Sequence, residues 1–257
     1  MFLNFFRRNK KRDEDIYELP IPENASFSFI GTDIHSHLVP GIDDGAKTVE
    51  DSVAMIKKLV SMGYRQIVTT PHVMIDMYRN TPETINNGLE ILKDALQKEG
   101  INIPIKAAAE YYIDEYFFSL IGKEPLLTVT KNEVLVEFSM LYEPPMLDTT
   151  IFNMQTLGYK PILAHPERYN SLHQNFERYQ QLKDKGCLFQ LNLLSLHGYY
   201  GRNVAEVAHK LLRRGMYDYC GTDMHHERHA DTIQSMLKTS AFLTLSGYPF
   251  RNNTLTF

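Results

Sequence analysis

Short apolar segments alternate with helical patterns along almost all of this chain of 257 residues. The segments are rich in aliphatic and β-branched residues, and the stretches between them repeat apolar positions three and four residues apart. Such alternation is typical of βα units whose strands run parallel in one sheet. It predicts seven strands, over 27–30, 66–70, 103–109, 133–138, 161–164, 187–193 and 217–221.

Local signals mark the ends of the intervening helices. Thr48 with Asp51 forms a capping-box pattern, and Thr81 followed by Pro82 is an N-cap with proline at the first helical position. A glycine follows most of the helical stretches, as is common at helix C-termini. The expected helices cover 48–62, 82–99, 147–157, 171–185, 203–214 and 232–242.

Polar residues at the strand ends indicate how the sheet closes. His35, His72, Glu110, His165 and Asp223 each follow the end of a different predicted strand. Taken singly, each could be a turn or surface residue. An open sheet would spread them along a line several strands wide, whereas in a (β/α) barrel all strand ends meet on one face, where active sites form. The pattern therefore favours a TIM-barrel-like α/β fold with these five side chains in one site.

The composition favours one globular domain in a reducing compartment. Hydrophobic residues make up 43% of the chain and charged residues 23%, which suffices for a sizeable core. No linker-rich break appears, so residues 26–257 are expected to form a single domain. A net charge of −4 without a dominant basic face gives no reason to propose nucleic-acid binding. Cys187 and Cys220 imply no disulfide framework, and the cytoplasm is the simplest location.

The beginning of the chain differs from the rest, and we expect residues 1–25 to be a flexible N-terminal extension. Within residues 1–12, four large apolar side chains precede five basic ones. A secretory signal has the opposite order and a longer apolar run. The segment could contact an anionic membrane surface weakly; the alternative is a disordered, solvated tail.

The segment 33–45 carries the densest group of candidate metal ligands. His35 and His37 are two apart on an extended backbone, so both imidazoles can reach one ion. Asp43 and Asp44 follow in a glycine-flanked turn and add oxygen ligands. Nitrogen with carboxylate suits zinc, manganese or iron better than calcium. The alternative is a pair of surface histidines beside a polar turn.

The whole set of residues indicates metal-assisted hydrolysis of a phosphate ester. A carboxylate among several histidines can bridge two divalent ions, which polarise a phosphoryl group and lower the pKa of bound water. Arg168 adds a planar guanidinium group whose N–H donors match phosphate oxygens, although it could instead be a surface arginine paired with Glu167. A cysteine phosphatase would need an arginine six residues after the cysteine, and those positions hold Leu193 and His226.

The chain resembles the polymerase-and-histidinol-phosphatase (PHP) superfamily. Within it, the resemblance is to the bacterial manganese-dependent protein-tyrosine phosphatases encoded with capsule and exopolysaccharide genes. It covers about residues 31–228 and implies a distorted barrel of seven strands. The motifs that carry it are Asp-Ile-His-Ser-His at 33–37, Asp-Asp-Gly at 43–45, Thr-Pro-His at 70–72, Ala-Glu at 109–110, Ala-His-Pro-Glu-Arg at 164–168 and Gly-Thr-Asp-Met-His at 221–225.

The resemblance also implies a metal centre of two or three ions, manganese in the first place, with iron, zinc or magnesium as alternatives. By this resemblance, Arg168 binds phosphate and stabilises the transition state, and Asp43 orients a ligand or the leaving group. Arg228 is a second candidate phosphate contact, although its spacing from the last metal histidine differs from the family pattern. The implied ligands are His35, His37, Glu110 and Asp223 for the first ion, Glu110 and His165 for the second, and Asp44, His72 and His225 for the third.

The resemblance implies removal of phosphate from phosphotyrosine, on a membrane-associated bacterial tyrosine kinase that controls polysaccharide export. The enzyme would then be cytoplasmic, or peripheral at the inner face of the membrane. One alternative is a small-molecule phosphatase, acting on histidinol phosphate or a nucleotide at the same site. Another is a metal-stabilised binding or regulatory subunit without turnover. Tyrosines that could form an aromatic rim for a phenyl phosphate are Tyr111, Tyr112, Tyr142, Tyr199 and Tyr200. For most of them the alternative is packing in the core or on the surface.

Overall fold

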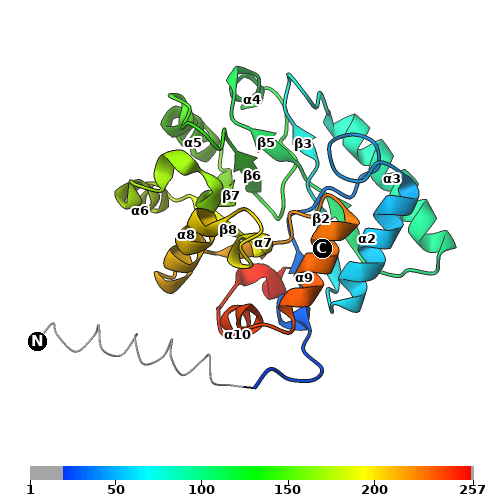
Figure 1. The fold of residues 1–257 in the computed structure, drawn as a ribbon. Coiled ribbons are helices and arrows are strands. Elements are labelled where there is room, and N and C mark those ends of the chain that lie inside the picture. The colour runs from blue at the N-terminus through cyan, green and yellow to red at the C-terminus, as the bar shows by residue number, and fades with distance from the viewer. Residues whose placement is uncertain (1–19, 256–257) are drawn as a thin grey trace, which may run out of the picture.

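The computed structural model describes residues 20–255 and places the strands at the centre with helices around them (Figure 1). Every pair of neighbouring strands runs parallel. The α/β class with a parallel sheet is therefore confirmed. The strands are β1 Thr32–Asp33, β2 Gln66–Thr69, β3 His72–Val73, β4 Ile105–Ala107, β5 Glu110–Tyr112, β6 Glu133–Glu137, β7 Lys160–Ala164, β8 Leu188–Asn192 and β9 Tyr219–Gly221.

Two of the seven predicted strands, 66–70 and 103–109, form the shorter strands β2 and β4, and each is followed by a second short strand that was not predicted, β3 or β5. The strands divide into a three-stranded sheet, β1-β2-β4, and a six-stranded sheet, β3-β5-β6-β7-β8-β9. The breaks fall between β2 and β3 and between β4 and β5. Pro71 lies in the first of them and has no N–H to donate. Backbone bonds from Ala108 to Thr69 (2.8 Å) and from Glu110 to Pro71 (3.1 Å) nevertheless hold the two segments side by side. The seven strand positions thus remain recognisable as β1, β2 with β3, β4 with β5, and β6 to β9.

The first strand was predicted in the wrong place. The apolar run 27–30 forms a 3-10 helix, Phe27–Phe29, and β1 begins only at Thr32. Gly31, with φ of +76°, turns the chain between the two. A short apolar run does not distinguish a buried strand from a buried turn of helix.

The first and last strand positions meet, so that the strands form a barrel-like ring. Ser36 and Met224 form a parallel β-bridge just beyond β1 and β9. The backbone N–H and hydroxyl of Thr222 donate to the buried carboxylate of Asp33 at 2.9 and 2.8 Å. The side-chain amide of Asn252 donates to the backbone oxygens of Thr32 and Cys220. These contacts join the two ends of the strand order.

Most helices lie where the sequence predicts them. The capping box of Thr48 with Asp51 is formed, and Thr81 caps a helix that begins at Pro82. The predicted helix 171–185 begins only after its cap at Asn175, and 232–242 is replaced by two helices, of which the first begins after its cap at His226. The helices are α2 Val49–Ser61, α3 Pro82–Lys98, α4 Glu115–Leu120, α5 Leu147–Thr156, α6 Phe176–Asp184, α7 Leu193–Leu196, α8 Arg202–Arg213, α9 Glu227–Met236 and α10 Ser240–Ser246.

A small apolar cluster, separate from the main core, contains residues from most strand positions. Leu135 and Ile162 belong to it, together with Ile34, Val68, Ala108 and Tyr219. Leu135 is two residues before Glu137, so the two side chains point to the same side of β6. The cluster therefore forms an apolar floor beneath the polar residues at the strand ends.

Most of the predicted N-terminal extension lies outside the described residues, namely residues 1–19, which include the segment with the predicted membrane contact. Ile21 and Ala25, which are described, are partly buried and pack against the core.

Within residues 20–255, no helix has both the length and the apolar character needed to cross a bilayer.

Candidate metal centre

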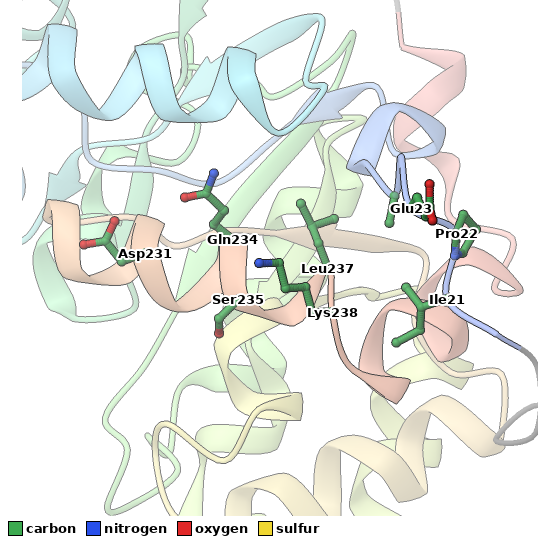
Figure 2. Close-up of a pocket in the computed structure, with 9 residues that line it drawn as sticks. Ile21, Pro22, Glu23, Asp231, Gln234, Ser235, Leu237 and Lys238 are labelled. Atoms are coloured by element: carbon green, nitrogen blue, oxygen red, sulfur yellow. The ribbon is translucent and has the colours of Figure 1, made fainter.

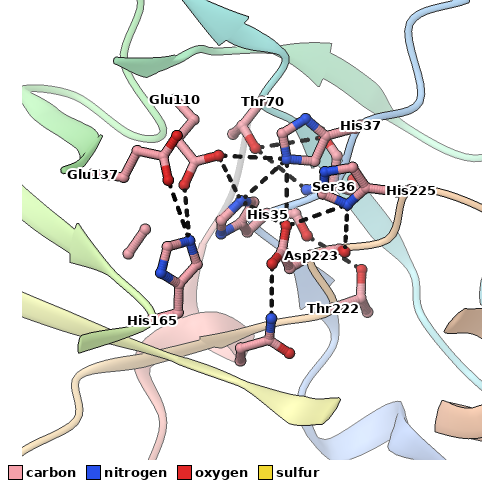
Figure 3. A network of polar contacts seen from close by, with 12 residues as sticks. His35, Ser36, His37, Thr70, Glu110, Glu137, His165, Thr222, Asp223 and His225 are labelled. Carbon is pink, nitrogen blue, oxygen red and sulfur yellow. Dashed lines mark hydrogen bonds and ion pairs between the residues drawn. The ribbon is translucent and has the colours of Figure 1, made fainter. Parts of the chain in front are cut away.

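The strand ends bring histidine and carboxylate side chains into one buried cluster (Figure 3). His35 follows β1, His165 follows β7 and Asp223 follows β9, while Glu110 begins β5 and Glu137 ends β6. All five are at least nine-tenths buried. The structure thus brings together side chains separated by up to 188 positions in the sequence (223 minus 35), as the barrel interpretation predicts.

Glu110 lies at the middle of the cluster. Its Oε2 lies 3.2 Å from His35 Nε2, 3.4 Å from His37 Nε2 and 3.2 Å from His72 Nδ1. Its Oε1 lies 3.2 Å from His165 Nε2. One carboxylate therefore faces four imidazoles: Oε2 faces three of them, and Oε1 faces the fourth. This is the arrangement expected of a ligand shared between ions.

Several atoms of the cluster lack ordinary hydrogen bonds. Both oxygens of Glu110 and Nδ1 of His72, which face one another, are buried without a hydrogen-bond partner, as is the outer ring nitrogen of His165, Nδ1. Buried polar atoms are almost always paired, so unpaired ones at a single place need an explanation. Nitrogen and carboxylate donors suit divalent transition metals. The residues present therefore fit a group of metal ions.

Four overlapping groups have ligand atoms close enough to hold an ion. In each, the atoms lie within 4.8 Å of one another. The groups are His35, His37 and Glu110; His35, His165 and Asp223; His72, Glu110 and Glu137; and His37, Asp44, His72 and His225. All eight predicted ligands occur in them.

Glu137 was not predicted as a ligand. Its carboxylate lies 3.1 Å from His72 Nδ1 and 3.7 Å from His165 Nε2, and it forms one of the candidate groups with His72 and Glu110. It is the last residue of β6. A carboxylate at a predicted strand end was the available signal, the same one that identified Glu110.

The carboxylates of Glu110 and Asp223 are charged, because the pKa of each is held well below its usual range. Burial would raise the pKa of Glu110, but the positive charges of His35 and His72 outweigh it and hold the pKa well below its usual range. Burial would lower the pKa of His35, but the negative charges of Glu110 and Asp223 raise it to about 9. The centre therefore attracts cations, and a metal ion must displace protons from its imidazoles.

Side chains around the cluster set the orientation of two histidines. Nδ1 of His37 donates to Asp43 Oδ2 and Nδ1 of His35 to Gln190 Oε1, each at 2.8 Å. An ionised carboxylate can only accept a hydrogen bond, so Nδ1 of His37 carries the shared proton. Nε2 of the same ring is then left to bind a metal ion. The backbone N–H of His72 donates to the same oxygen of Asp43 at 3.1 Å. This placement favours the interpretation of Asp43 as a residue that orients a ligand.

Arg168 lies at the edge of the cluster with part of its side chain accessible to solvent. Its Nη1 donates to Asp223 Oδ2 at 2.7 Å, and Asn192 Nδ2 donates to the same oxygen at 2.7 Å. The guanidinium also lies 4.2 Å from the ring centre of Tyr200. The predicted alternative, a surface pair with Glu167, is wrong because Glu167 is buried and accepts from Asn192 and Tyr217.

Arg228 lies apart from these residues. It is exposed near the start of α9, three residues beyond His225. Among the described residues, no ion pair or side-chain hydrogen bond joins it to the cluster. Its role as a phosphate contact remains a prediction that the structure does not support with a contact.

Backbone conformation supports the close packing of the site. His165 and Asp223 have φ of 33° and 49°, in the left-handed region that costs energy for residues other than glycine and is concentrated at functional sites. Gly45 lies against His37: a Cβ there would be 2.1 Å from the backbone oxygen of His37. A side chain at position 45 would therefore displace a candidate ligand.

Neither the cysteines nor a large surface cavity provides a rival site. Burial raises the pKa of Cys187 to about 12 and that of Cys220 well above its ordinary value, so neither is a thiolate nucleophile at neutral pH. A cavity of about 800 Å³ lies between residues 21–25 and α9 (Figure 2). No candidate metal ligand is among its lining residues, which include Ile21, Asp231 and Lys238.

Comparison with known proteins decides the family. The model for the CpsB/CapC family of capsular polysaccharide synthesis proteins matches residues 31–243. The chain belongs to the CpsB/CapC family. The match spans all the candidate metal ligands, and the predicted resemblance to capsule-associated tyrosine phosphatases is confirmed.

Relatives of this CpsB/CapC chain include named phosphatases. It is 29% identical over 194 residues to the tyrosine-protein phosphatase YwqE of Bacillus subtilis (strain 168), covering 75% of this chain and 76% of YwqE. It is 32% identical over 200 residues to the tyrosine-protein phosphatase CpsB of Streptococcus agalactiae serotype III (strain NEM316), covering 75% and 82%.

A solved structure shows the same fold. The solved chain belongs to a crystallographic study of YwqE from Bacillus subtilis and CpsB from Streptococcus pneumoniae, described there as unique metal-dependent tyrosine phosphatases. It superposes on this CpsB/CapC chain with a TM-score of 0.72 at 26% identity, covering 88% of this chain and 96% of the solved one.

Proposed function

We propose that this CpsB/CapC protein is a metal-dependent phosphatase that removes phosphate from tyrosine residues of a protein in capsular polysaccharide synthesis. The observation that carries the proposal is the carboxylate of Glu110 facing four imidazoles at 3.2–3.4 Å, with Arg168 at the edge of the same cluster. Relatives named as tyrosine-protein phosphatases support the choice of substrate.

Nine residues are proposed to hold two or three ions: His35, His37, Asp44, His72, Glu110, Glu137, His165, Asp223 and His225. Manganese is the first candidate because the family resemblance implies it; the mixture of imidazole and carboxylate suits manganese, iron and zinc, and magnesium is a further alternative. Divalent ions in such a site polarise the phosphoryl group and lower the pKa of bound water.

The protein's own groups have three tasks. Asp43 and Gln190 fix the rings of His37 and His35 in the orientation described above. Asn192 holds Asp223 by a hydrogen bond of 2.7 Å. Arg168 presents guanidinium N–H groups at the mouth of the site, where they would bind phosphate oxygens and stabilise the negative charge that develops on them.

The partner and location follow from this function. A tyrosine-phosphorylated, membrane-associated tyrosine kinase is the proposed substrate, and the cytoplasm, or the inner face of the membrane, is the proposed location. Residues 26–257 would form the single catalytic domain, and residues 1–25 the extension through which the protein could approach a membrane.

The test compares two substrates. Phosphate release by the manganese-loaded protein is measured with a phosphotyrosine peptide and with histidinol phosphate at equal concentrations. We expect a strong preference for the peptide. Preference for histidinol phosphate would overturn the substrate assignment but keep the site, and absence of turnover on both would overturn the assignment as a phosphatase.

A further inference from the structure

Half of the exposed large apolar side chains lie on segments that follow the strand ends. Eight large hydrophobic side chains are exposed in the described part of the chain. Four lie on or just after the outer helices. The others are Met77 after β3, Leu141 and Tyr142 after β6, and Tyr199 after α7, which directly follows β8. In a parallel arrangement these loops leave the strands on the same face as the metal cluster.

The loop 138–146 between β6 and α5 (the β6–α5 loop) carries two of these side chains. Leu141 is 76% exposed and Tyr142 is 61% exposed. An exposed leucine alone needs no explanation, but two adjacent large apolar side chains in solvent are typical of a contact surface.

The loop is fixed on both sides of these two residues. Before them, the backbone N–H of Asn170 donates to the oxygen of Met140 at 2.9 Å. After them, Arg178 donates to both oxygens of Glu143, with the shortest distance 2.6 Å, and it also pairs with Asp148 at 2.7 Å. Leu141 and Tyr142 are thus held out in solvent by a loop that is otherwise anchored, which lowers the entropy lost when a partner binds.

The anchored loop lies within reach of the site. Glu137, whose carboxylate contacts His72 and His165, is four residues before Leu141, so their Cα atoms are at most about 14 Å apart. That distance corresponds to about four residues of an extended peptide. The residues that flank a phosphotyrosine bound at the cluster are therefore long enough to reach Leu141.

We infer that the β6–α5 loop is a docking element for the protein substrate, with Leu141 contacting apolar side chains that flank the phosphotyrosine. This inference rests on the proposed function. Arg178 and Glu143 are positioning residues that hold the loop. A free aryl phosphate lacks the residues that flank a phosphotyrosine, so the loop would select proteins over small phosphate esters.

The test replaces Leu141 and uses two substrates. The values of kcat/KM are measured for Leu141→Ser with a phosphotyrosine peptide that carries leucine near the phosphotyrosine, and with para-nitrophenyl phosphate. We expect about a tenfold loss with the peptide, mainly through KM, and no change with para-nitrophenyl phosphate. Glu143→Gln, which weakens the anchor, should raise KM for the peptide in the same selective way.

A matched control and the opposing outcomes complete the design. Phe152→Ser removes an apolar side chain that is 66% exposed on α5, and both activities should stay at the wild-type value. An unchanged kcat/KM of Leu141→Ser with the peptide would overturn the inference, as would an equal loss on both substrates. A change of molecular mass in solution for Leu141→Ser would instead assign the loop to self-association. If the wild-type protein hydrolyses neither substrate, the proposed function itself fails.

Discussion

His37 donates a hydrogen bond from Nδ1 to Asp43 at 2.8 Å, and its Nε2 lies 3.4 Å from the carboxylate of Glu110. Although burial would raise the pKa of Asp43, His37 holds it below the ordinary range, so Asp43 is a charged acceptor. The pair therefore fixes the tautomer that can bind a metal ion.

Replacing Asp43 by Asn should weaken metal binding by about 10–100-fold, because residues that orient a ligating histidine typically contribute that much. Activity measured against manganese concentration should show a shifted midpoint and recover at high manganese. A loss of kcat that manganese does not restore would contradict the orienting role and assign Asp43 to the chemical step.

Replacing Arg168 by Met should lower kcat by about 10²–10³, equivalent to about 2.7–4 kcal/mol of lost transition-state stabilisation. The comparison variant is Arg228→Ala. Arg228 is exposed and has no described contact with the cluster, so its replacement should change kcat/KM by less than about threefold. A large loss in Arg228→Ala would show that this side chain reaches the phosphate after all.

Removal of metal should abolish turnover and destabilise the fold. An ion at a thousandfold excess over its Kd stabilises the folded state by about 4 kcal/mol, which for a chain of this size corresponds to a change in Tm of roughly 10 °C. EDTA treatment followed by calorimetry should show this decrease, and manganese should restore Tm and activity together. Full activity after exhaustive chelation would contradict a metal-dependent reaction.

The thiols should be inert. With the pKa of Cys187 at about 12 and that of Cys220 well above its ordinary value, the thiolate fraction at pH 8 is about 10⁻⁴ or less. Iodoacetamide should leave the mass of the native protein and its phosphatase activity unchanged. Inactivation in step with alkylation of either thiol would point to cysteine chemistry.

The sequence predicts much of this site because its signal is simple. Parallel strands end on one face, so polar residues after successive strands are predicted to meet, and His35, His165 and Asp223 do so. Local capping patterns at Thr48 and Thr81 likewise set helix starts correctly, because these signals involve residues only three positions apart.

What the sequence does not reveal depends on register and on contacts between distant residues. Glu137 and Gln190 reach the cluster because their side chains point to the inner side of β6 and β8. Pairing with neighbouring strands sets this orientation. The apolar run at 27–30 fits a strand or a helical turn equally well, and only the turn at Gly31 decides. The bond from Asn192 to Asp223 connects two strand ends across 31 positions.

Glu110 is the proposed shared ligand at the middle of the cluster, so its replacement tests the metal centre most directly. The measurement is the metal content of wild-type and Glu110→Gln protein after manganese loading, with turnover of a phosphotyrosine peptide on the same samples. We predict two or three ions per wild-type chain, fewer in the variant, and a loss of turnover greater than about a hundredfold. A Glu110→Gln protein with wild-type metal content and wild-type turnover would contradict the assignment of this cluster as the active site.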